Sequence, residues 1–170
     1  ADARLRIYEN ARRLAADLIQ LGITVNCAPV ADIFVEGADP IIGDRAYGHT
    51  PQHVISRAKQ MADGLLEGGV SPVLKHIPGH GRALVDSHLE LPIITTDIAQ
   101  LRRTDFMPFE SLSDLPYAMT AHVIFTAIDP DEPVTFSRDS IRLIREEIGF
   151  GGVLMSDDLS MKALSGDYTS

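Results

Sequence analysis

The residues best suited to chemistry lie in one stretch of the chain, between Lys75 and His88. Three of the six histidines fall in it, at positions 76, 80 and 88, interleaved with proline and glycine. They follow the short apolar run 72–74, which predicts a strand that ends in a rigid polar loop. Such a loop is a poor way to build a core and a good way to present proton-transfer groups at one face of a sheet.

Asp86 and His88 are the first candidates for proton transfer. They are separated by one residue, so their side chains can point to the same side of an extended loop. A carboxylate placed there can hold the imidazole in one tautomer and raise its basicity. The same spacing fits a loop in which Asp86 caps a turn and His88 is solvated, so the residues alone leave both interpretations open.

A metal site is another interpretation of this stretch. His76 and His80 could ligate a metal ion, with Asp86 or His88 completing the set, and the protein would then be a metal-dependent hydrolase. The proline and glycine between the two histidines rule out a regular helix that would align positions four apart. The spacing also matches none of the standard zinc patterns, which disfavours this interpretation.

Two basic residues nearby could hold a ligand. Lys75 ends an otherwise apolar strand, and because buried lysine is rare unless paired, we expect it to face a polar cavity. The alternative is a lysine that extends to water at the sheet edge. Arg45 could pair with Asp44, or its forked donors could hold a ligand hydroxyl or carboxylate.

Asp157 and Asp158 form a second signal, directly after the apolar run 153–156. A carboxylate at the end of a strand can act as a nucleophile. Adjacent acids can also cap the next helix, and Asp158 or Ser156 would suffice for that. The spacing supports both interpretations equally.

Helices and strands alternate along the whole chain. Gly22, Gly68 and Gly149 follow expected helices, and Thr50 and Ser137 are expected N-caps. The expected helices are 4–21, 51–67, pieces within 97–112 broken at Pro108, 138–148, and one that begins over 159–164. The expected strands are 23–30, 70–76, 117–123 and 152–156, with loops from the second strand to Pro92 and over 124–137.

This alternation predicts an α/β protein with a parallel sheet, as one domain over residues 1–170. Polar residues follow each strand, among them Asp32 and Arg45 after the first, as expected for either a (β/α)₈ barrel or a doubly wound sheet. No dinucleotide-binding glycine motif follows the first strand, which disfavours the second. A barrel needs roughly 200 residues or more, so four strands indicate about half of one.

Composition excludes several classes of function. The net charge of -9 argues against a nucleic-acid or anionic-membrane surface, and 45% apolar residues are typical of a globular domain. No apolar run approaches the roughly 18 residues that span a bilayer.

Cys27 is the only cysteine; we expect a buried strand thiol in a reducing compartment. The chain does not begin with methionine, shows no secretory signal and opens into a helix pattern, which suggests a fragment.

Several segments, in order, resemble glycoside hydrolase family 3. They are KHIPGHG at 75–81, DSH at 86–88, MTAHVIF at 119–125 and GFGGVLMSDDLSM at 149–161. More narrowly, they resemble the bacterial β-N-acetylhexosaminidases of peptidoglycan recycling, and the segments 26–32 and 43–48 fit the same group. The resemblance covers nearly the whole chain, so it is far more specific than any one motif.

The resemblance implies a TIM-type barrel and a catalytic set. These enzymes remove a non-reducing terminal β-linked N-acetylglucosamine with retention of configuration, without a cofactor or metal. Asp157 matches the nucleophile, His88 the general acid/base and Asp86 the carboxylate that supports it. The implied substrate is a muropeptide or disaccharide that contains N-acetylglucosamine, and the implied location is the cytoplasm.

The resemblance also assigns the residues that hold the sugar. Arg45, Lys75 and His76 match sugar-binding residues, and His122 and Met161 are weaker candidates for lining the site. The family's barrel has further sequence before residue 1, including a sugar-binding aspartate and arginine, and two further strands after residue 170. This chain would then be a central fragment with exposed strand edges, soluble through self-association, or a sugar-binding module without turnover.

Overall fold

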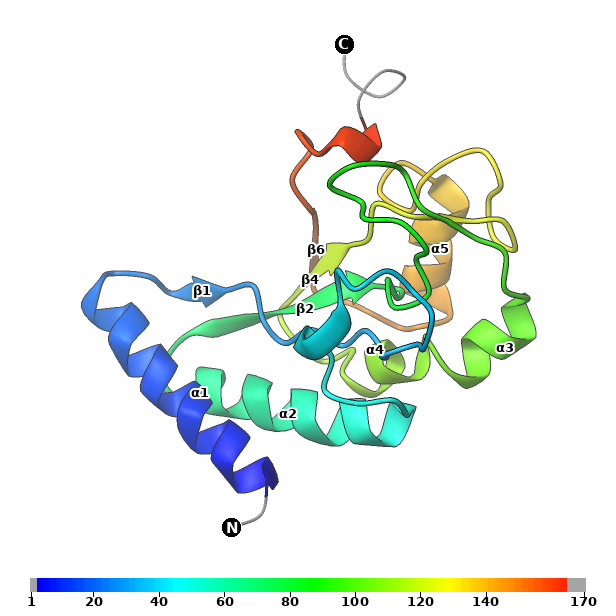
Figure 1. The fold of residues 1–170 in the computed structure, drawn as a ribbon. Coiled ribbons are helices and arrows are strands. Elements are labelled where there is room, and N and C mark those ends of the chain that lie inside the picture. Colours follow the sequence, from blue (N-terminus) through cyan, green and yellow to red (C-terminus); the bar gives the residue numbers. More distant parts are fainter. Residues whose placement is uncertain (1–2, 165–170) are drawn as a thin grey trace.

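Four parallel strands form the central sheet. The computed structural model describes residues 3–164. Strands β1 (Val25–Asn26), β2 (Ser71–Ile77), β4 (Tyr117–Thr120) and β6 (Val153–Ser156) are hydrogen-bonded in that order, and every pair is parallel. The predicted α/β architecture, an incomplete TIM-type barrel with about four βα units, is confirmed (Figure 1).

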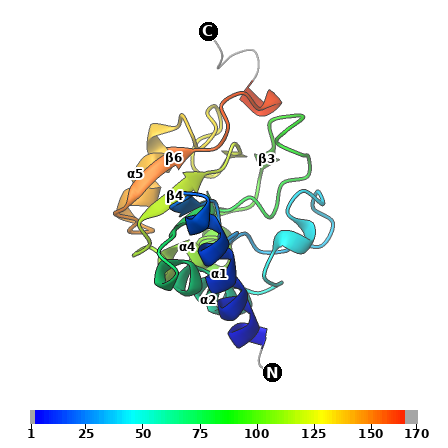
Figure 2. The same ribbon diagram turned by 90° about the vertical axis from the view of Figure 1, so that its left-hand side faces the viewer.

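Five α-helices connect and cover these strands. α1 packs along α2, and both lie on the same side of the sheet (Figures 1 and 2). The side chains of Thr50, Asp97 and Ser137 accept hydrogen bonds from free N–H groups in the first turns of the helices they precede. The helices are α1 (Ala3–Gln20), α2 (Pro51–Glu67), α3 (Ile98–Arg103), α4 (Met107–Ser111) and α5 (Arg138–Glu146).

The first strand is shorter and more exposed than the sequence predicts. Only Val25–Asn26 pairs with β2, and Val30 makes an isolated bridge to Lys75. Within residues 3–164, β1 is at the end of the strand order and pairs on one side only, so its side chains lack a second neighbouring strand there. The expectation of a buried Cys27 thiol is therefore wrong, because Cys27 is exposed.

Three other local predictions need correction. Ile124–Phe125, predicted as loop, is strand β5 and pairs with β3 (Ile93–Ile94) in a separate small sheet. Pro108 lies in the first turn of α4, where a missing N–H costs nothing, and does not break a helix. Over 159–164 the structure has only the 3₁₀ turn η2 (Lys162–Leu164), because the Asp158 side chain bonds Ser160 in a tight turn.

The main hydrophobic core lies between the sheet and helices α2, α4 and α5. Phe106, Phe109, Phe125 and Phe150 are among its largest buried side chains. The two outer strands contrast with this core, since Val25 of β1 is 41% exposed and Val153 of β6 is 58% exposed. The sheet is well packed in its middle and open at both ends.

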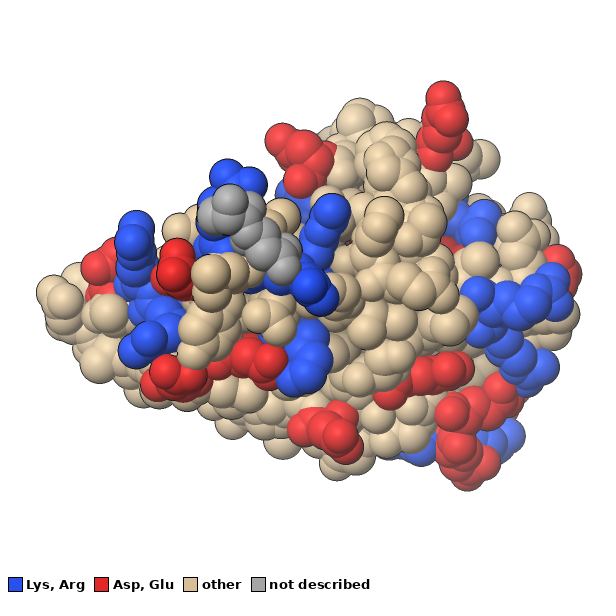
Figure 3. Space-filling view, turned by 90° about the horizontal axis from the view of Figure 1, so that it is seen from below, with Lys and Arg blue, Asp and Glu red and all other residues tan. Residues whose placement is uncertain are grey.

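The charged surface is mixed in sign. On the face drawn in Figure 3, acidic and basic side chains are interspersed over α1 and α2. This agrees with the absence of a basic cluster in the sequence. Among residues 3–164, no helix is long and apolar enough to cross a membrane.

Candidate active site

A cavity of about 160 Å³ lies at the carboxyl ends of the strands, and we call it the strand-end cavity. All six residues predicted for the site have a place in it or beside it: five line it, and Asp86 holds the sixth position through a hydrogen bond to His88. The lining residues are Ile41, Ile42, Arg45, Lys75, His76, His80, Ser87, His88 and Asp157.

Asp157 follows β6 directly and presents its carboxylate to this cavity. Its side chain is 27% exposed, so a ligand can reach it. Oδ1 accepts a hydrogen bond from the Asp158 backbone N–H at 2.8 Å, and Oδ2 lies 3.7 Å from His76 Nε2, which also belongs to the cavity wall. Asp158 itself bonds Ser160 and acts in the turn, so the two adjacent acids have different tasks.

Asp86 and His88 form a hydrogen-bonded pair. Asp86 Oδ1 accepts from the His88 ring Nδ1–H at 2.7 Å and from the His88 backbone N–H at 2.8 Å. The backbone hydrogen bond from His88 lowers the pKa of Asp86 most; burial opposes it, and the ring hydrogen bond adds to the lowering. The ionised Asp86 fixes the proton on Nδ1, so the His88 Nε2 atom is free to exchange a proton with a ligand. The His88 side chain is 57% exposed.

His76 lies between two carboxylates. Its Nδ1–H donates to Asp32 Oδ2 at 2.7 Å, and its Nε2 is 3.7 Å from Asp157 Oδ2. The register between β2 and β4 shifts at this point, so that Lys75 and Ile77 have partners on β4 and His76 is skipped. The ring is thereby released from the regular pattern of the strand and lines the cavity.

Asp32 is buried, with 1% of its surface exposed, and was predicted only as a polar residue after the first strand. Burial alone would raise its pKa, but the charge and hydrogen bond of His76, helped by His80, outweigh burial and lower it. Asp32 is therefore ionised at neutral pH. It does not line the cavity, but its partner His76 does.

His80 and Ser87 join the loop to the cavity wall. His80 Nε2 lies 3.0 Å from Ser87 Oγ, and both residues are 4% exposed. Burial lowers the pKa of His80, against a smaller opposite effect from Asp32, so this ring is neutral at neutral pH. This contact ties His80 to the segment between Asp86 and His88.

Lys75 and Arg45 approach the cavity from different elements. Lys75 lies two residues before the end of β2. It is partly buried, as expected for a lysine that faces a polar cavity. Arg45 ends the short 3₁₀ helix η1 (Gly43–Arg45), and its Nη1 donates to the Ile41 carbonyl oxygen at 3.0 Å. The sequence left open whether Arg45 pairs with Asp44. In the structure its guanidinium binds a backbone carbonyl oxygen instead.

The two weaker candidates do not line the cavity. His122 is 1% exposed, with Nδ1 beside Thr135 Oγ1 at 2.8 Å and Nε2 beside the Asp158 carbonyl oxygen at 3.1 Å. Burial lowers its pKa, against smaller opposing hydrogen bonds and charges. Both ring nitrogens are thus occupied in supporting the segment after β6. Met161 is 7% exposed and is not among the residues that line the cavity.

The geometry does not favour the metal interpretation. Within residues 3–164, no group of three or more His, Cys, Asp or Glu side chains lies where it could hold a metal ion. One ring nitrogen of each histidine in the stretch is already engaged, by Asp32 for His76, by Ser87 for His80 and by Asp86 for His88. The loop histidines are arranged around protein partners and not around a common centre.

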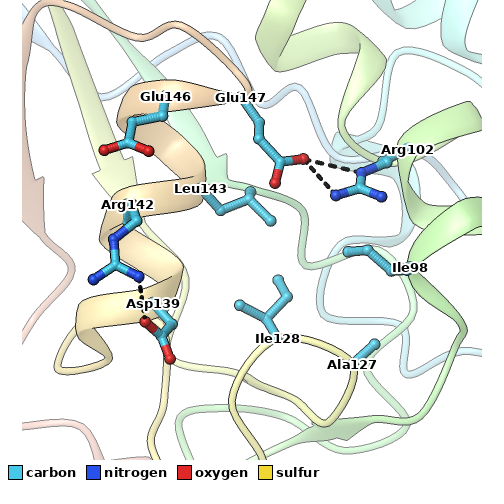
Figure 4. A pocket seen from close by; sticks show the side chains of 9 residues that line it. All are labelled: Ile98, Arg102, Ala127, Ile128, Asp139, Arg142, Leu143, Glu146 and Glu147. Atoms are coloured by element: carbon cyan, nitrogen blue, oxygen red, sulfur yellow. Dashed lines mark hydrogen bonds and ion pairs between the residues drawn. The ribbon is translucent and has the colours of Figure 1, made fainter.

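A second cavity lies elsewhere, and we call it the α3–α5 groove (Figure 4). Its volume is about 320 Å³, twice that of the strand-end cavity. Two ion pairs lie on its rim, Arg102–Glu147 and Arg142–Asp139. The lining residues are Ile98, Arg102, Ala127, Ile128, Asp139, Arg142, Leu143, Glu146 and Glu147.

Sequence reasoning missed three residues that shape the strand-end cavity. Ile41 and Ile42 form its apolar wall, and Ser87 binds His80. The two isoleucines give no chemical signal of their own. Ser87 could have been suspected from its position between the two members of the Asp86–His88 pair.

Comparisons of the sequence with known proteins show one consistent likeness. Residues 2–170 match the model of the glycosyl hydrolase family 3 N terminal domain. A beta-hexosaminidase of Alkalilimnicola ehrlichii is 40% identical over 166 residues, which cover 96% of this chain and 47% of that protein. The chain therefore spans about half the length of the curated relatives it matches.

Solved structures show the same likeness. A family 3 β-N-acetylglucosaminidase from Paenibacillus superposes with a TM-score of 0.93 at 36% identity, covering 97% of this chain and 32% of that one. NagZ from Neisseria gonorrhoeae, in complex with N-trifluoroacetyl-D-glucosamine, gives 0.87 at 35% identity, covering 93% and 47%. NagZ has also been solved in complex with a zinc ion.

Proposed function

Because this chain belongs to glycosyl hydrolase family 3, we propose that it carries the catalytic centre of a β-N-acetylglucosaminidase that retains configuration. One observation carries the proposal: a single cavity is lined by a strand-end carboxylate, Asp157, and by a histidine, His88, which is backed by the carboxylate of Asp86. A retaining glycosidase needs a nucleophile and a proton donor at one sugar.

The first step would break the glycosidic bond. Asp157 attacks the anomeric carbon, while protonated His88 donates its Nε2 proton to the departing oxygen. The products are a glycosyl ester on Asp157 and the free leaving-group alcohol. Asp86 stabilises the imidazolium before the transfer and keeps the ring in one orientation afterwards.

The second step would restore the enzyme. Neutral His88 takes a proton from water, and the water oxygen attacks the anomeric carbon of the ester. Asp157 leaves as a carboxylate and His88 is again protonated. Two displacements at one carbon return the sugar with its original β configuration.

Three further residues would hold the sugar. Arg45 and Lys75 offer cationic donors to its hydroxyl groups, and His76 presents Nε2 to the same space. The occurrence of N-trifluoroacetyl-D-glucosamine in the related NagZ complex supports an N-acylated sugar as the occupant.

We also propose the biological setting. The substrate would be a muropeptide or disaccharide from peptidoglycan that ends in N-acetylglucosamine, hydrolysed in the cytoplasm. Residues 1–170 would form part of one catalytic barrel domain. NagZ among the similar structures supports the substrate class, and the single cysteine suits a reducing compartment.

The open ends of the sheet support a proposal about association. Val25 on β1 and Val153 on β6 are exposed apolar residues of strands that pair on one side only. Such edges favour pairing with another strand. We expect the 170-residue chain alone to self-associate, which light scattering coupled to gel filtration would measure.

The test of the function is hydrolysis of 4-nitrophenyl N-acetyl-β-D-glucosaminide by the protein that carries this chain, followed by proton NMR of the first sugar formed. The β anomer should appear first and the rate should be unchanged by a chelator. Initial release of the α anomer would contradict retention. Loss of activity on chelation would favour the metal-dependent hydrolase, and binding of N-acetylglucosamine without hydrolysis would favour a sugar-binding module.

A further inference from the structure

Asp32 is the best-connected buried charge near the strand-end cavity, although it does not line it. Three N–H donors converge on its two oxygens. Oδ2 accepts from the His76 ring Nδ1–H at 2.7 Å, and Oδ1 accepts from the His80 backbone N–H at 2.6 Å. The His76 backbone N–H lies 3.3 to 3.4 Å from the two oxygens.

We propose that Asp32 is a positioning residue that sets both halves of the site, the His76 ring beside Asp157 and the loop that leads to His88. The effect of Asp32 on catalysis rests on the proposed function above. Its effect on the positions of the two histidines does not, because those hydrogen bonds lie within the protein.

The first half is the His76 ring. With Nδ1–H held by Asp32, the atom that faces the cavity is Nε2, 3.7 Å from Asp157 Oδ2. When the ring is neutral, Nε2 is an acceptor for a sugar hydroxyl; when it is protonated, Nε2–H attracts the nucleophile's charge. A ring held through Nε2 would present Nδ1 to the cavity. Asp32 therefore determines which ring nitrogen faces Asp157 and the sugar.

The second half is the loop. Asp32 anchors the His80 backbone, and the His80 ring reaches Ser87, between Asp86 and His88. His80 Nδ1 is buried without a partner among the described residues. A buried lone pair without a partner costs less than a buried N–H, so we assign the proton to Nε2, which donates to Ser87 Oγ.

Backbone packing reinforces the same link. Gly81 lies so close to the segment after Asp32 that a Cβ added to it would be 2.0 Å from the Ile33 carbonyl oxygen. Only glycine allows this approach. A continuous path therefore runs from Asp157 through His76, Asp32 and His80 to the loop of the acid/base.

A carboxylate is required at this position because both of its oxygens accept. In Asp32→Asn, one oxygen becomes an NH₂ group. If the amide oxygen faces the His76 ring, the NH₂ group meets the His80 N–H; if it is turned round, the NH₂ group meets the ring N–H. The first orientation leaves the buried His80 N–H without an acceptor. The second makes the His76 ring move its proton to Nε2 or turn away, so either orientation releases one half of the site.

The test combines nitrogen-15 NMR of the histidine rings with steady-state kinetics on the protein that carries this chain. The matched control is Asp105→Asn. Asp105 is also buried, at 4% exposure, but it pairs with Arg82 at 2.8 Å and not with the histidines. Both substitutions remove a buried carboxylate charge, so a general loss of stability would appear in both.

In the wild type we expect the neutral His76 ring to carry its proton on Nδ1 and the His80 ring on Nε2. Asp32→Asn should change one of these two signals and lower kcat roughly 10- to 100-fold, with a smaller change in KM. Asp105→Asn should leave both ring signals at their wild-type positions, and it should lower kcat less than Asp32→Asn does.

Two results would overturn the proposal: unchanged ring signals and kcat in Asp32→Asn, or a neutral His76 in the wild type with its proton on Nε2. The second needs no variant, so it decides the matter even if Asp32→Asn does not fold. If the wild type does not hydrolyse the substrate, the proposed function fails, while the ring signals still test the role of Asp32.

Discussion

The strand-end cavity and the α3–α5 groove differ in how their charges are held. The groove is twice as large, yet four of its five charged lining residues pair with each other at the surface, Arg102 with Glu147 and Arg142 with Asp139. The side chains of these pairs are between 47% and 58% exposed. In the strand-end cavity, by contrast, the rings of His76 and His88 are each hydrogen-bonded to a carboxylate that does not line the cavity.

Asp32 holds His76 from the core, and Asp86 holds His88 from the loop. Each histidine therefore keeps one nitrogen for its support and the other for a ligand. Catalysis depends on groups that are fixed in place before the substrate arrives. Volume alone would have selected the groove, whereas the pattern of support selects the strand-end cavity.

The largest expected difference between the two regions is the effect of removing a carboxylate on turnover. Asp157→Ala should lower kcat on 4-nitrophenyl N-acetyl-β-D-glucosaminide by roughly four orders of magnitude or more, because it removes the nucleophile. The groove control, Glu147→Ala, should retain normal kcat. Turnover by Asp157→Ala close to that of the wild type would remove Asp157 from the mechanism.

Removing the proton donor should have an effect that depends on the leaving group. With a poor leaving group, His88→Ala should lower the rate of the first step roughly 100- to 1000-fold, because the departing oxygen then needs a proton. With 4-nitrophenolate the loss should be smaller. Equal losses for a disaccharide and the nitrophenyl glycoside would contradict the acid role.

The buried histidines predict how stability depends on pH. Burial lowers the pKa of His80 and of His122 below their ordinary value of 6.5. Below pH 6.5 the unfolded chain therefore binds protons that the folded chain does not, and the free energy of unfolding falls as the pH drops. Asp32, whose pKa is also lowered, adds a further loss below about pH 4.

Urea unfolding followed by circular dichroism between pH 7.5 and 5 would measure this loss. His122→Gln keeps a polar group that can bond Thr135 and cannot titrate, so its stability should depend less steeply on pH. His53→Gln, at an exposed position of α2, is the control. A wild-type free energy of unfolding that stays constant over this range would contradict the assignment of neutral buried rings.

The smallest effect is expected at the groove. Arg102 and Glu147 are both about half exposed, and exposed ion pairs contribute little because water and salt screen them. Glu147→Gln should change the free energy of unfolding by at most about 1 kcal/mol. A loss of several kcal/mol, or a change in kcat, would show that the groove matters more than its geometry suggests.

Local signals explain which parts of the fold the sequence could predict. Helix α2 was predicted at both ends, because Thr50 and Pro51 mark its start and Gly68 its end within a few residues. The burial of Cys27 was predicted wrongly, because exposure depends on whether a strand lies beside β1. The two-residue strands β3 and β5 are too short to show a period.

The same distinction applies to the site. Asp86 and His88 are two residues apart, so their pairing was open to sequence reasoning and the structure places them in contact. Asp32 and His76 are 44 residues apart and meet only because β1 and β2 are neighbours. The role of Asp32 was therefore visible only as a polar residue after a strand.

The proposed mechanism depends most on the covalent step at Asp157, and trapping tests that step directly. An N-acetylglucosaminyl fluoride with a second fluorine at ring carbon 5 slows both displacements, while its good leaving group lets the ester accumulate. Mass spectrometry of the protein and its peptides should find one sugar adduct, on Asp157. An adduct on another residue, or turnover of the probe without any adduct, would contradict the account.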